Sequence, residues 1–191
     1  MCIRDRIGLG IIMLALSLIV AATMPLRTST ELAPLFLEIS HSPILAVLLG
    51  LCLGFGCFSS LAAVIITSGL VTAGVIPVST GLWVALGADI ESTILALMTT
   101  MTASRIGRRG PVANTMWRAV TLSFTALLLA TCPFIAEGFG AIPDSIIYFH
   151  VTLNLIISGT GLFIIKPFAR IADRIIPEKK ADAKTGGEAA D

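Results

Sequence analysis

Charged residues are scarce in this chain of 191 residues. Asp, Glu, Lys and Arg together make up 13% of it, whereas a soluble domain carries about a quarter. Hydrophobic residues account for 55%, and the mean hydropathy is +0.95. This balance predicts an integral membrane protein. The net charge of +1 gives no basic field that would attract nucleic acid, so we expect no such partner.

Side chains suited to metal or covalent chemistry are also few. The four cysteines have no metal-ligand spacing, and three lie in apolar segments, where cysteine is typically a small buried hydrophobic residue. The chain contains no Ser–His–Asp arrangement, no His-Glu-x-x-His motif and no paired catalytic aspartates. We therefore expect no disulfide, zinc site, organic cofactor or enzymatic activity.

The two ends of the chain differ from its apolar middle. Residues 1–6, MCIRDR, resemble a translated sequencing adapter joined to a truncated reading frame, so we expect a non-native leader. No cleavable signal peptide is visible. Residues 177–191 are polar and rich in Ala, Gly, Lys and Glu, which predicts a disordered cytoplasmic tail. Residues 7–176 then form the transmembrane part.

Five apolar blocks lie between these ends. They cover residues 7–24, 44–75, 82–103, 112–135 and 146–165. Four of them fit one crossing each, because a helix needs about 20 apolar residues to cross a hydrocarbon core of about 30 Å. The second block would be about 48 Å long as one helix, too long for one crossing and too short for two. We predict two half-helices that meet at residues 56–60 and form a re-entrant hairpin.

Basic residues predict the sides of the loops. Three arginines in residues 105–109 place that loop in the cytoplasm, and the loop EGFGAIPD, which has no Lys or Arg, lies outside. The segment between the first two blocks has an apolar spacing at Leu32, Leu35, Phe36 and Ile39 that predicts a short interfacial helix. That helix is external if the second block is re-entrant and cytoplasmic if it spans.

Ionisable side chains inside the third block predict function, because a carboxylate at bilayer depth costs at least about 2.5 kcal/mol. Asp89 and Glu91 precede Ser92 and Thr93 near the middle of that block. In a regular helix Glu91 is turned by about 200° from Asp89, so both cannot face one narrow cavity. Either the helix is interrupted after Gly87, or one acid faces a neighbouring helix.

Polar residues of the last two blocks are candidate partners. Arg118 lies about two turns inside the fourth block. It either snorkels to the cytoplasmic interface or pairs with Glu91 or, at longer reach, with Asp89. His150 and Asn154 are four residues apart, so they share one face of the fifth block and form a polar stripe.

Ser59 and Ser60 interrupt the second block. As packing residues, together with Gly54 and Gly56, they would let helices approach closely. As the start of the second half-helix they would direct backbone N–H groups and the positive end of the helix dipole into the protein, where these groups bind anions. The length of the block favours the second interpretation.

The hairpin tip FSSL and the segment GADIEST resemble motifs of the sodium-dependent phosphate cotransporter family. That family has two inverted repeats, each with a QSSS tip, an unwound GANIGTT helix and later helices with a His-x-x-Phe-Asn type motif. The segment LGIIMLALSLIVAATMPLR also resembles the family. The likeness covers residues 7–177 and is similar to the second repeat alone.

The resemblance implies that hydroxyls and backbone N–H groups bind phosphate. Ser59 and Ser60 match the first two serines of the tip. At the end of the second motif, Thr93 matches the family's threonine and Ser92 is a conservative replacement. Ser59, Ser60 and Thr93 are then also candidate sodium ligands. His150 and Asn154 match the later motif.

Departures from the family pattern lie at the site itself. They are Phe58, Leu61, Asp89, Glu91, Asn114 and Arg118. The two acids oppose anion binding unless they are protonated or paired, so we hypothesise that Arg118 compensates for them. The alternatives are a degenerate repeat that acts as a scaffold, and a transporter with altered substrate or proton coupling.

These observations predict an all-α integral membrane protein with four spanning helices plus one re-entrant helical hairpin, half of an inverted-repeat transporter. The hairpin covers residues 44–75, and a broken helix covers residues 82–103. The resemblance implies symport of inorganic phosphate with sodium across the plasma (bacterial inner) membrane. Besides phosphate, sodium and the lipid bilayer, we expect a missing N-terminal repeat or a second copy as partner.

Overall fold

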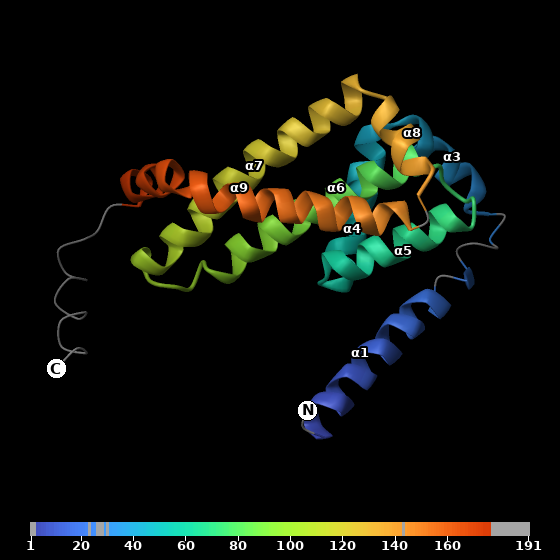
Figure 1. The fold of residues 1–191 in the computed structure, drawn as a ribbon, viewed down its shortest axis with the longest axis horizontal. Coiled ribbons are helices and arrows are strands. Elements are labelled where there is room, and N and C mark those ends of the chain that lie inside the picture. The colour runs from blue at the N-terminus through green and yellow to red at the C-terminus, as the bar shows by residue number, and fades with distance from the viewer. Residues whose placement is uncertain (1–2, 23, 26–28, 30, 143, 177–191) are drawn as a thin grey trace. The chain divides into compact units, whose positions relative to one another are not determined.

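The fold was described from a computed structural model (Figure 1). It describes residues 3–22, 24–25, 29, 31–142 and 144–176. Within this part of the chain the secondary structure is helical, with no strand. Met1 and Cys2 of the expected leader, and the expected tail at residues 177–191, lie outside the described residues.

Two compact units make up the chain. Unit 1 consists of Met1–Ser92 and Thr125–Leu153, and unit 2 consists of Thr93–Phe124 and Asn154–Asp191. Three long helices contribute residues to both units. They are α6 (Val78–Thr99), α7 (Arg105–Thr131) and α9 (Ser145–Ile175).

These long helices correspond to the third, fourth and fifth apolar blocks. In the described part of the chain, α6, α7 and α9 are the helices long and apolar enough to cross a membrane. Residues 7–22 of the first block lie in α1 (Ile3–Ala22), whose apolar stretch Arg6–Ile19 is shorter. The fourth span expected there stays a prediction.

The second apolar block is divided into two helices, as the length argument predicted. They are α4 (Pro43–Cys57) and α5 (Ser60–Thr72), which pack against each other and appear as separate helices in Figure 1. Phe58 ends α4 in the left-handed region, with φ of 49°, and Ser59 is extended, with φ of −160°. The chain therefore leaves one helix and enters the next within two residues.

Most of the third block lies in α6, which is continuous from Val78 to Thr99, so the interruption expected after Gly87 is wrong. Gly87 is instead a point of close backbone contact with α4. A Cβ atom added there would lie 2.2 Å from the carbonyl oxygen of Val47, and one added at Gly50 would lie 2.0 Å from that of Val84. Small residues serve this purpose where membrane helices cross, because they let two backbones meet.

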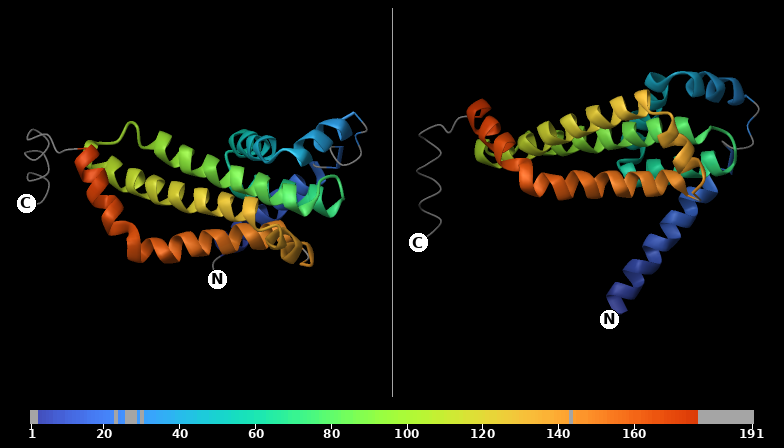
Figure 2. Two further views of the ribbon diagram at one scale, coloured as in Figure 1. Left: turned by 90° about the horizontal axis from the view of Figure 1, so that it is seen from above. Right: turned by 45° about the horizontal axis from the view of Figure 1, so that its top comes forward.

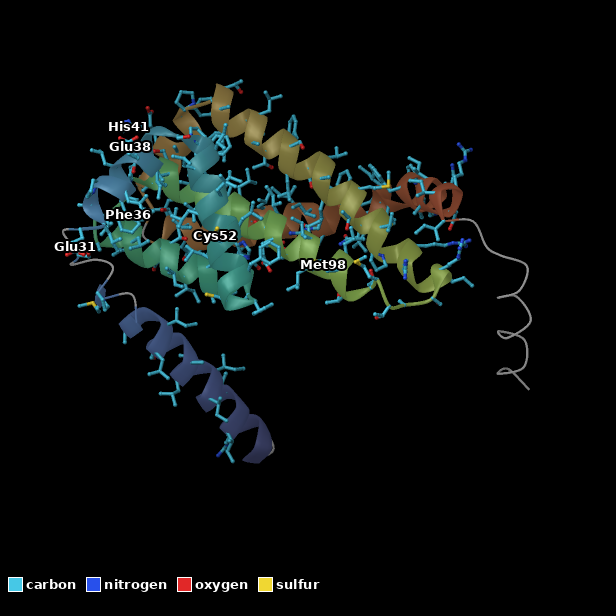
Figure 3. All side chains as sticks on the ribbon, turned by 180° about the vertical axis from the view of Figure 1, so that it is seen from behind. Glu31, Phe36, Glu38, His41, Cys52 and Met98 are labelled. Carbon is cyan, nitrogen blue, oxygen red and sulfur yellow. The ribbon has the colours of Figure 1, made fainter. Side chains whose placement is uncertain are left out.

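The short helix predicted between the first two blocks is α3 (Ala33–His41), and it packs against α4. Phe36 and Ile39 are buried in the core of unit 1, with Leu70 and Val84 among their neighbours. The buried stripe is narrower than the sequence predicted, because Leu35 is 53% exposed. Figure 3 shows Phe36, Glu38 and His41 along α3, and the latter two are exposed.

The last part of unit 1 covers the start of α6. A short helix, α8 (Phe134–Gly140), precedes α9, and the ring of Phe139 meets that of Phe149 edge-on at 5.5 Å. Ile146 of α9 is fully buried, and a Cβ atom added at Gly81 would lie 2.7 Å from its Cδ1. This side of α6 therefore also depends on a glycine.

Unit 2 is held by contacts between α7 and α9. The indole Nε1 of Trp117 donates to the carbonyl of Ile157 at 2.9 Å, and its ring lies 5.6 Å from that of Phe168. Arg109 forms a 3.3 Å ion pair with Asp173. Figure 2 shows α9 bending in its C-terminal part, where Pro167 lies inside the helix; proline causes such a bend because it removes a backbone donor.

Gly50→Ala should destabilise the protein by about 1–3 kcal/mol, because the added methyl group meets backbone rather than a flexible side chain. Thermal unfolding of the purified protein in mild detergent measures this. Gly56→Ala is the matched control, since a Cβ atom there meets nothing within 4 Å. Equal stability of the two variants would contradict the close α4–α6 contact.

Candidate functional site

The break between α4 and α5 is held by Ser59. Its backbone N–H donates to the carbonyl of Gly54 at 3.3 Å, and its Oγ accepts from the N–H of Ala62 at 3.2 Å. Ser59 is therefore the N-cap of α5, and Ser60 is the first residue of that helix. The predicted helix N-terminus at this position is present, with first-turn N–H groups that have no partner inside the helix.

Phe58 precedes this cap in an unusual conformation. A left-handed backbone is unfavourable for a bulky residue, and the Phe58 side chain is 74% exposed, so no packing around the ring accounts for it. Such conformations cluster at binding sites and switch regions. The strain favours a functional interpretation of the break over simple helix packing.

Glu91 lies against α4 one turn before the break. A Cβ atom added at Gly54 would come within 2.8 Å of its Cγ and 2.9 Å of its Oε2. The Glu91 side chain is fully buried, and neither carboxylate oxygen has a hydrogen-bond partner among the described residues. The lack of a side chain at Gly54 thus leaves room for Glu91, and the Gly54 carbonyl accepts from Ser59.

Asp89 faces a different helix from Glu91, as a continuous α6 requires. Its Oδ2 lies 3.2 Å from Nδ1 of His150 in α9, and only 1% of Asp89 is exposed. Ser92 donates its hydroxyl to the Asp89 carbonyl at 2.9 Å, a bond within the helix. The acid–histidine pair places a positive charge beside Asp89 whenever His150 is protonated.

A second polar cluster belongs to unit 2. Nε of Arg118 donates to Oγ1 of Thr93 at 2.8 Å, and its Nη1 donates to Oδ1 of Asn154 at 3.2 Å. Arg118 therefore binds neighbouring helices, and simple snorkelling does not describe it. The hypothesised pair with Glu91 is not formed, because the Glu91 oxygens have no partner in the described part of the chain.

The sequence-predicted residues thus fall into three groups. Ser59 and Ser60 form the start of α5, and Glu91 lies near it because it packs against Gly54. Asp89 pairs with His150. Thr93 and Asn154 accept hydrogen bonds from Arg118. Gly50 and Trp117 were not anticipated. Gly50 and Gly54, which the sequence had indicated as a packing residue, are four residues apart, and this small-xxx-small spacing could have revealed the α4–α6 contact. No sequence pattern indicates the role of Trp117, because its indole N–H donates to a backbone carbonyl that is distant in the sequence.

The fold and these clusters define a helical membrane protein. In sequence the chain is similar to "Putative inorganic phosphate export protein YjbB" of Escherichia coli K12, with 31% identity over 180 residues, or 92% of this chain and 33% of the relative. Proteins of that name from Shigella flexneri and Salmonella typhimurium are 31% and 30% identical. The chain spans about a third of the length of these curated relatives. No family model and no solved structure matches it.

A double-mutant cycle tests the Asp89–His150 pair. Asp89→Asn and His150→Gln should each destabilise the protein, and the double variant should be more stable than the sum of the two predicts, with a coupling energy of about 1–3 kcal/mol, as contacting residues show. Thermal unfolding in detergent supplies the free energies. Additive effects would mean that the two side chains do not interact.

Proposed function

We propose that this chain is part of a membrane transporter that moves inorganic phosphate, and that the break between α4 and α5 handles the anion. The observation that carries the proposal is a serine-capped helix start, preceded by a strained residue, between two apolar helices. The names of the similar proteins support phosphate as the substrate and transport rather than enzymatic chemistry. We propose that the whole transporter includes more chain than this, a proposal supported by the match to only about a third of the length of those relatives.

The chemistry of the break suits a phosphate oxygen. The first-turn N–H groups of α5 and the positive end of its dipole attract an anion, and the hydroxyls of Ser59 and Ser60 donate hydrogen bonds in addition. In the proposed arrangement, α4 and α5 enter the membrane and return to the same side. Backbone broken at membrane depth survives where it lines a cavity, and alternating access would expose this cavity to each side in turn.

The two intramembrane acids then serve the coupling ion. An ionised carboxylate without hydrogen bonds is costly inside a membrane protein, so Glu91 is best accommodated when it carries a proton or binds a cation. Sodium is the coupling ion that the resemblance implies, with Ser59, Ser60 and Thr93 as its candidate ligands. A proton is the second candidate, and the unpartnered, fully buried Glu91 favours it.

The proposed location is the plasma membrane, which is the inner membrane in bacteria. Arginines in residues 105–109 favour a cytoplasmic position for the start of α7, and in this proposal the C-terminus lies on the same side. The partner that completes the site is either a preceding inverted repeat or a second copy of the chain. The similar proteins are named for export, so flux needs to be followed in both directions.

Ser59→Asp should lower phosphate flux by about tenfold or more, because an aspartate caps a helix as well as serine does but repels an anion at the same position. Radiolabelled phosphate flux into and out of proteoliposomes measures this. Ser59→Asn is the matched control: it also caps α5 and adds no charge, so flux should fall less. Equal flux in the two variants would contradict an anion site at the break.

Glu91→Gln should separate coupling from binding. The variant cannot release a proton or hold a cation by charge, so phosphate flux driven by an imposed ion gradient should fall to the level seen without the gradient. Imposing a sodium gradient and a proton gradient separately on the unmodified protein identifies the ion. Glu38→Gln, an exposed acid on α3, is the control. Full gradient-driven flux in Glu91→Gln would overturn the coupling role.

A further inference from the structure

Helix α9 is longer than one membrane crossing requires. Its 31 residues would measure about 46 Å at about 1.5 Å per residue, whereas the hydrocarbon core is about 30 Å thick. The proline at which α9 bends, Pro167, follows about 33 Å of helix, which is close to one crossing. The remaining part, residues 168–175, therefore needs an environment other than the hydrocarbon core.

The exposed face of α9 changes its chemistry at this bend. Before the bend, Leu162 and Phe163 are 79% and 84% exposed, which suits contact with lipid tails. That side of the helix continues, at intervals of three or four residues, with Lys166, Arg170 and Arg174. All three basic residues are exposed. A change from apolar to basic side chains is typical of the place where a spanning helix leaves the hydrocarbon.

The acid in this segment is already paired. Asp173 is the one acid in residues 166–176, and its Oδ1 lies 3.3 Å from Nε of Arg109 in α7. The same Nε donates to the carbonyl of Ile176 at 3.1 Å, so Arg109 also holds the end of α9. The three basic residues of the stripe therefore give this end of unit 2 a positive field.

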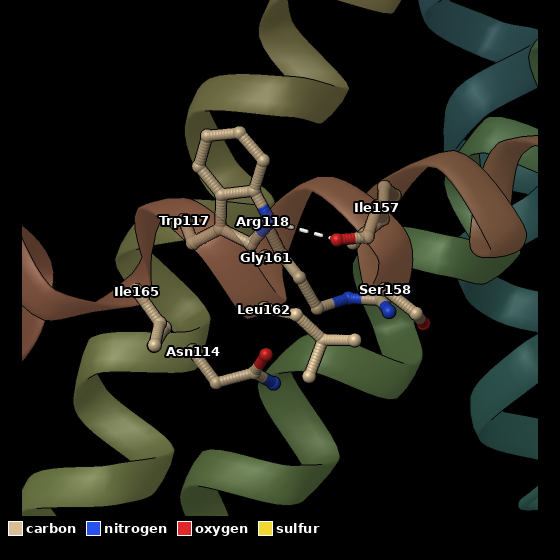
Figure 4. A pocket seen from close by; sticks show the side chains of 8 residues that line it. All are labelled: Asn114, Trp117, Arg118, Ile157, Ser158, Gly161, Leu162 and Ile165. Atoms are coloured by element: carbon tan, nitrogen blue, oxygen red, sulfur yellow. Dashed lines mark hydrogen bonds between the residues drawn. The ribbon is translucent and has the colours of Figure 1, made fainter.

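Trp117 of α7 holds both sides of the bend. Its indole Nε1 donates to the carbonyl of Ile157, before Pro167, as the dashed line in Figure 4 marks. Its ring lies 5.6 Å from that of Phe168, after Pro167. Phe168 is partly buried and Ala172 is fully buried, so this side of the segment faces protein. Packing against α7 therefore supports the bent conformation.

The third side of the segment is apolar and exposed. Ile171 and Ile175 are 40% and 60% exposed, and residues four apart share one side of a helix. Ile171 is turned by about 60° from Arg174 around the helix axis, so the apolar side borders the basic side. An apolar stripe beside a basic stripe is typical of a helix that lies in the membrane interface.

We propose that residues 168–175 form an interfacial helix that binds anionic phospholipids. Lys166, Arg170 and Arg174 bind the lipid phosphates, and Ile171 and Ile175 enter the boundary of the acyl chains. The charge of the stripe requires an anionic partner. The exposed isoleucines beside it favour a lipid surface over a soluble anion, because they give the apolar part of the same molecule a place to bind.

A fluorophore at residue 175 measures which lipids gather at this segment. Ile175→Cys is made in the full chain with its four natural cysteines replaced by serine, labelled with bimane and placed in phosphatidylcholine nanodiscs. Part of the lipid is then replaced by phosphatidylglycerol or phosphatidylcholine that carries a nitroxide near the top of an acyl chain. We expect phosphatidylglycerol to reach half-maximal quenching at an about fivefold lower mole fraction, the effect of one basic residue near an anionic surface.

Neutralising the stripe should remove this preference. In the variant Lys166→Gln/Arg170→Gln/Arg174→Gln, the two lipids should quench at equal mole fractions, because glutamine keeps the length of the side chains and removes their charge. In the unmodified stripe the preference should disappear in about 1 M sodium chloride, where the screening length is about 3 Å.

The matched control removes three charges from the sequence that follows α9. Lys179→Gln/Lys180→Gln/Lys184→Gln should change the preference less than about twofold, because acids in residues 177–191 offset these lysines. The two triple variants carry the same net charge, so a difference between them assigns the lipid preference to the stripe.

Equal quenching by the two lipids, an equal loss in both triple variants, or a preference that persists in high salt would each overturn the proposal. Absence of quenching by either lipid would also overturn it, because another surface would then cover the segment. If the triple variant of the stripe does not fold, an unchanged preference in both Arg170→Gln and Arg174→Gln overturns the proposal instead. Phosphate flux in proteoliposomes is scored separately, so an active transporter without this lipid preference refutes this inference and not the transport function.

Discussion

The close approach of α4 to α6 is the constraint on which unit 1 depends. Gly50 and Gly87 bring the two backbones into contact, and Gly54 receives the side chain of Glu91. Without hydrophobic drive between helices in lipid, such contact relies on tight packing of small residues. It fixes where α4 can end, and so where Ser59 can begin α5. The Ser59 cap, the buried Glu91 and the crossing with α6 therefore all contact one short stretch of α4, from Gly50 to Gly54.

This arrangement gives the buried acids different roles. Asp89 has a histidine partner and is fixed in a polar pair, whereas the side chain of Glu91 is fully buried and has no hydrogen-bond partner among the residues that the structure describes. A buried carboxyl group without hydrogen bonds is tolerated where its protonation or its binding of a cation has a function, since intramembrane ionisable residues mark ion and proton pathways. Gly54 lies against the Glu91 side chain, and its carbonyl accepts from the Ser59 N–H. In the proposed transporter, ion binding at Glu91 and anion binding at the break would influence each other through this short path.

The helix break was predictable from sequence because it follows from length: the second block fits neither one crossing nor two. The identity of Ser59 as the cap followed from residue type at that break. The continuity of α6 was not predictable, because a glycine before two acids is compatible with a break or with close packing, and the deciding atom is the Val47 carbonyl on another helix. Arg118 was expected to pair with an acid, and the sequence did not single out the hydroxyl and amide on α6 and α9 that accept hydrogen bonds from it.

Protection of Cys57 by phosphate tests the central claim most directly. This cysteine is exposed and lies two residues before the Ser59 cap. In a variant where Cys57 is the single cysteine, its rate of alkylation by a soluble maleimide is measured in native membranes with phosphate or with chloride at equal ionic strength. An anion site at the break predicts slower alkylation that saturates with phosphate. Identical rates at all phosphate concentrations would contradict the account.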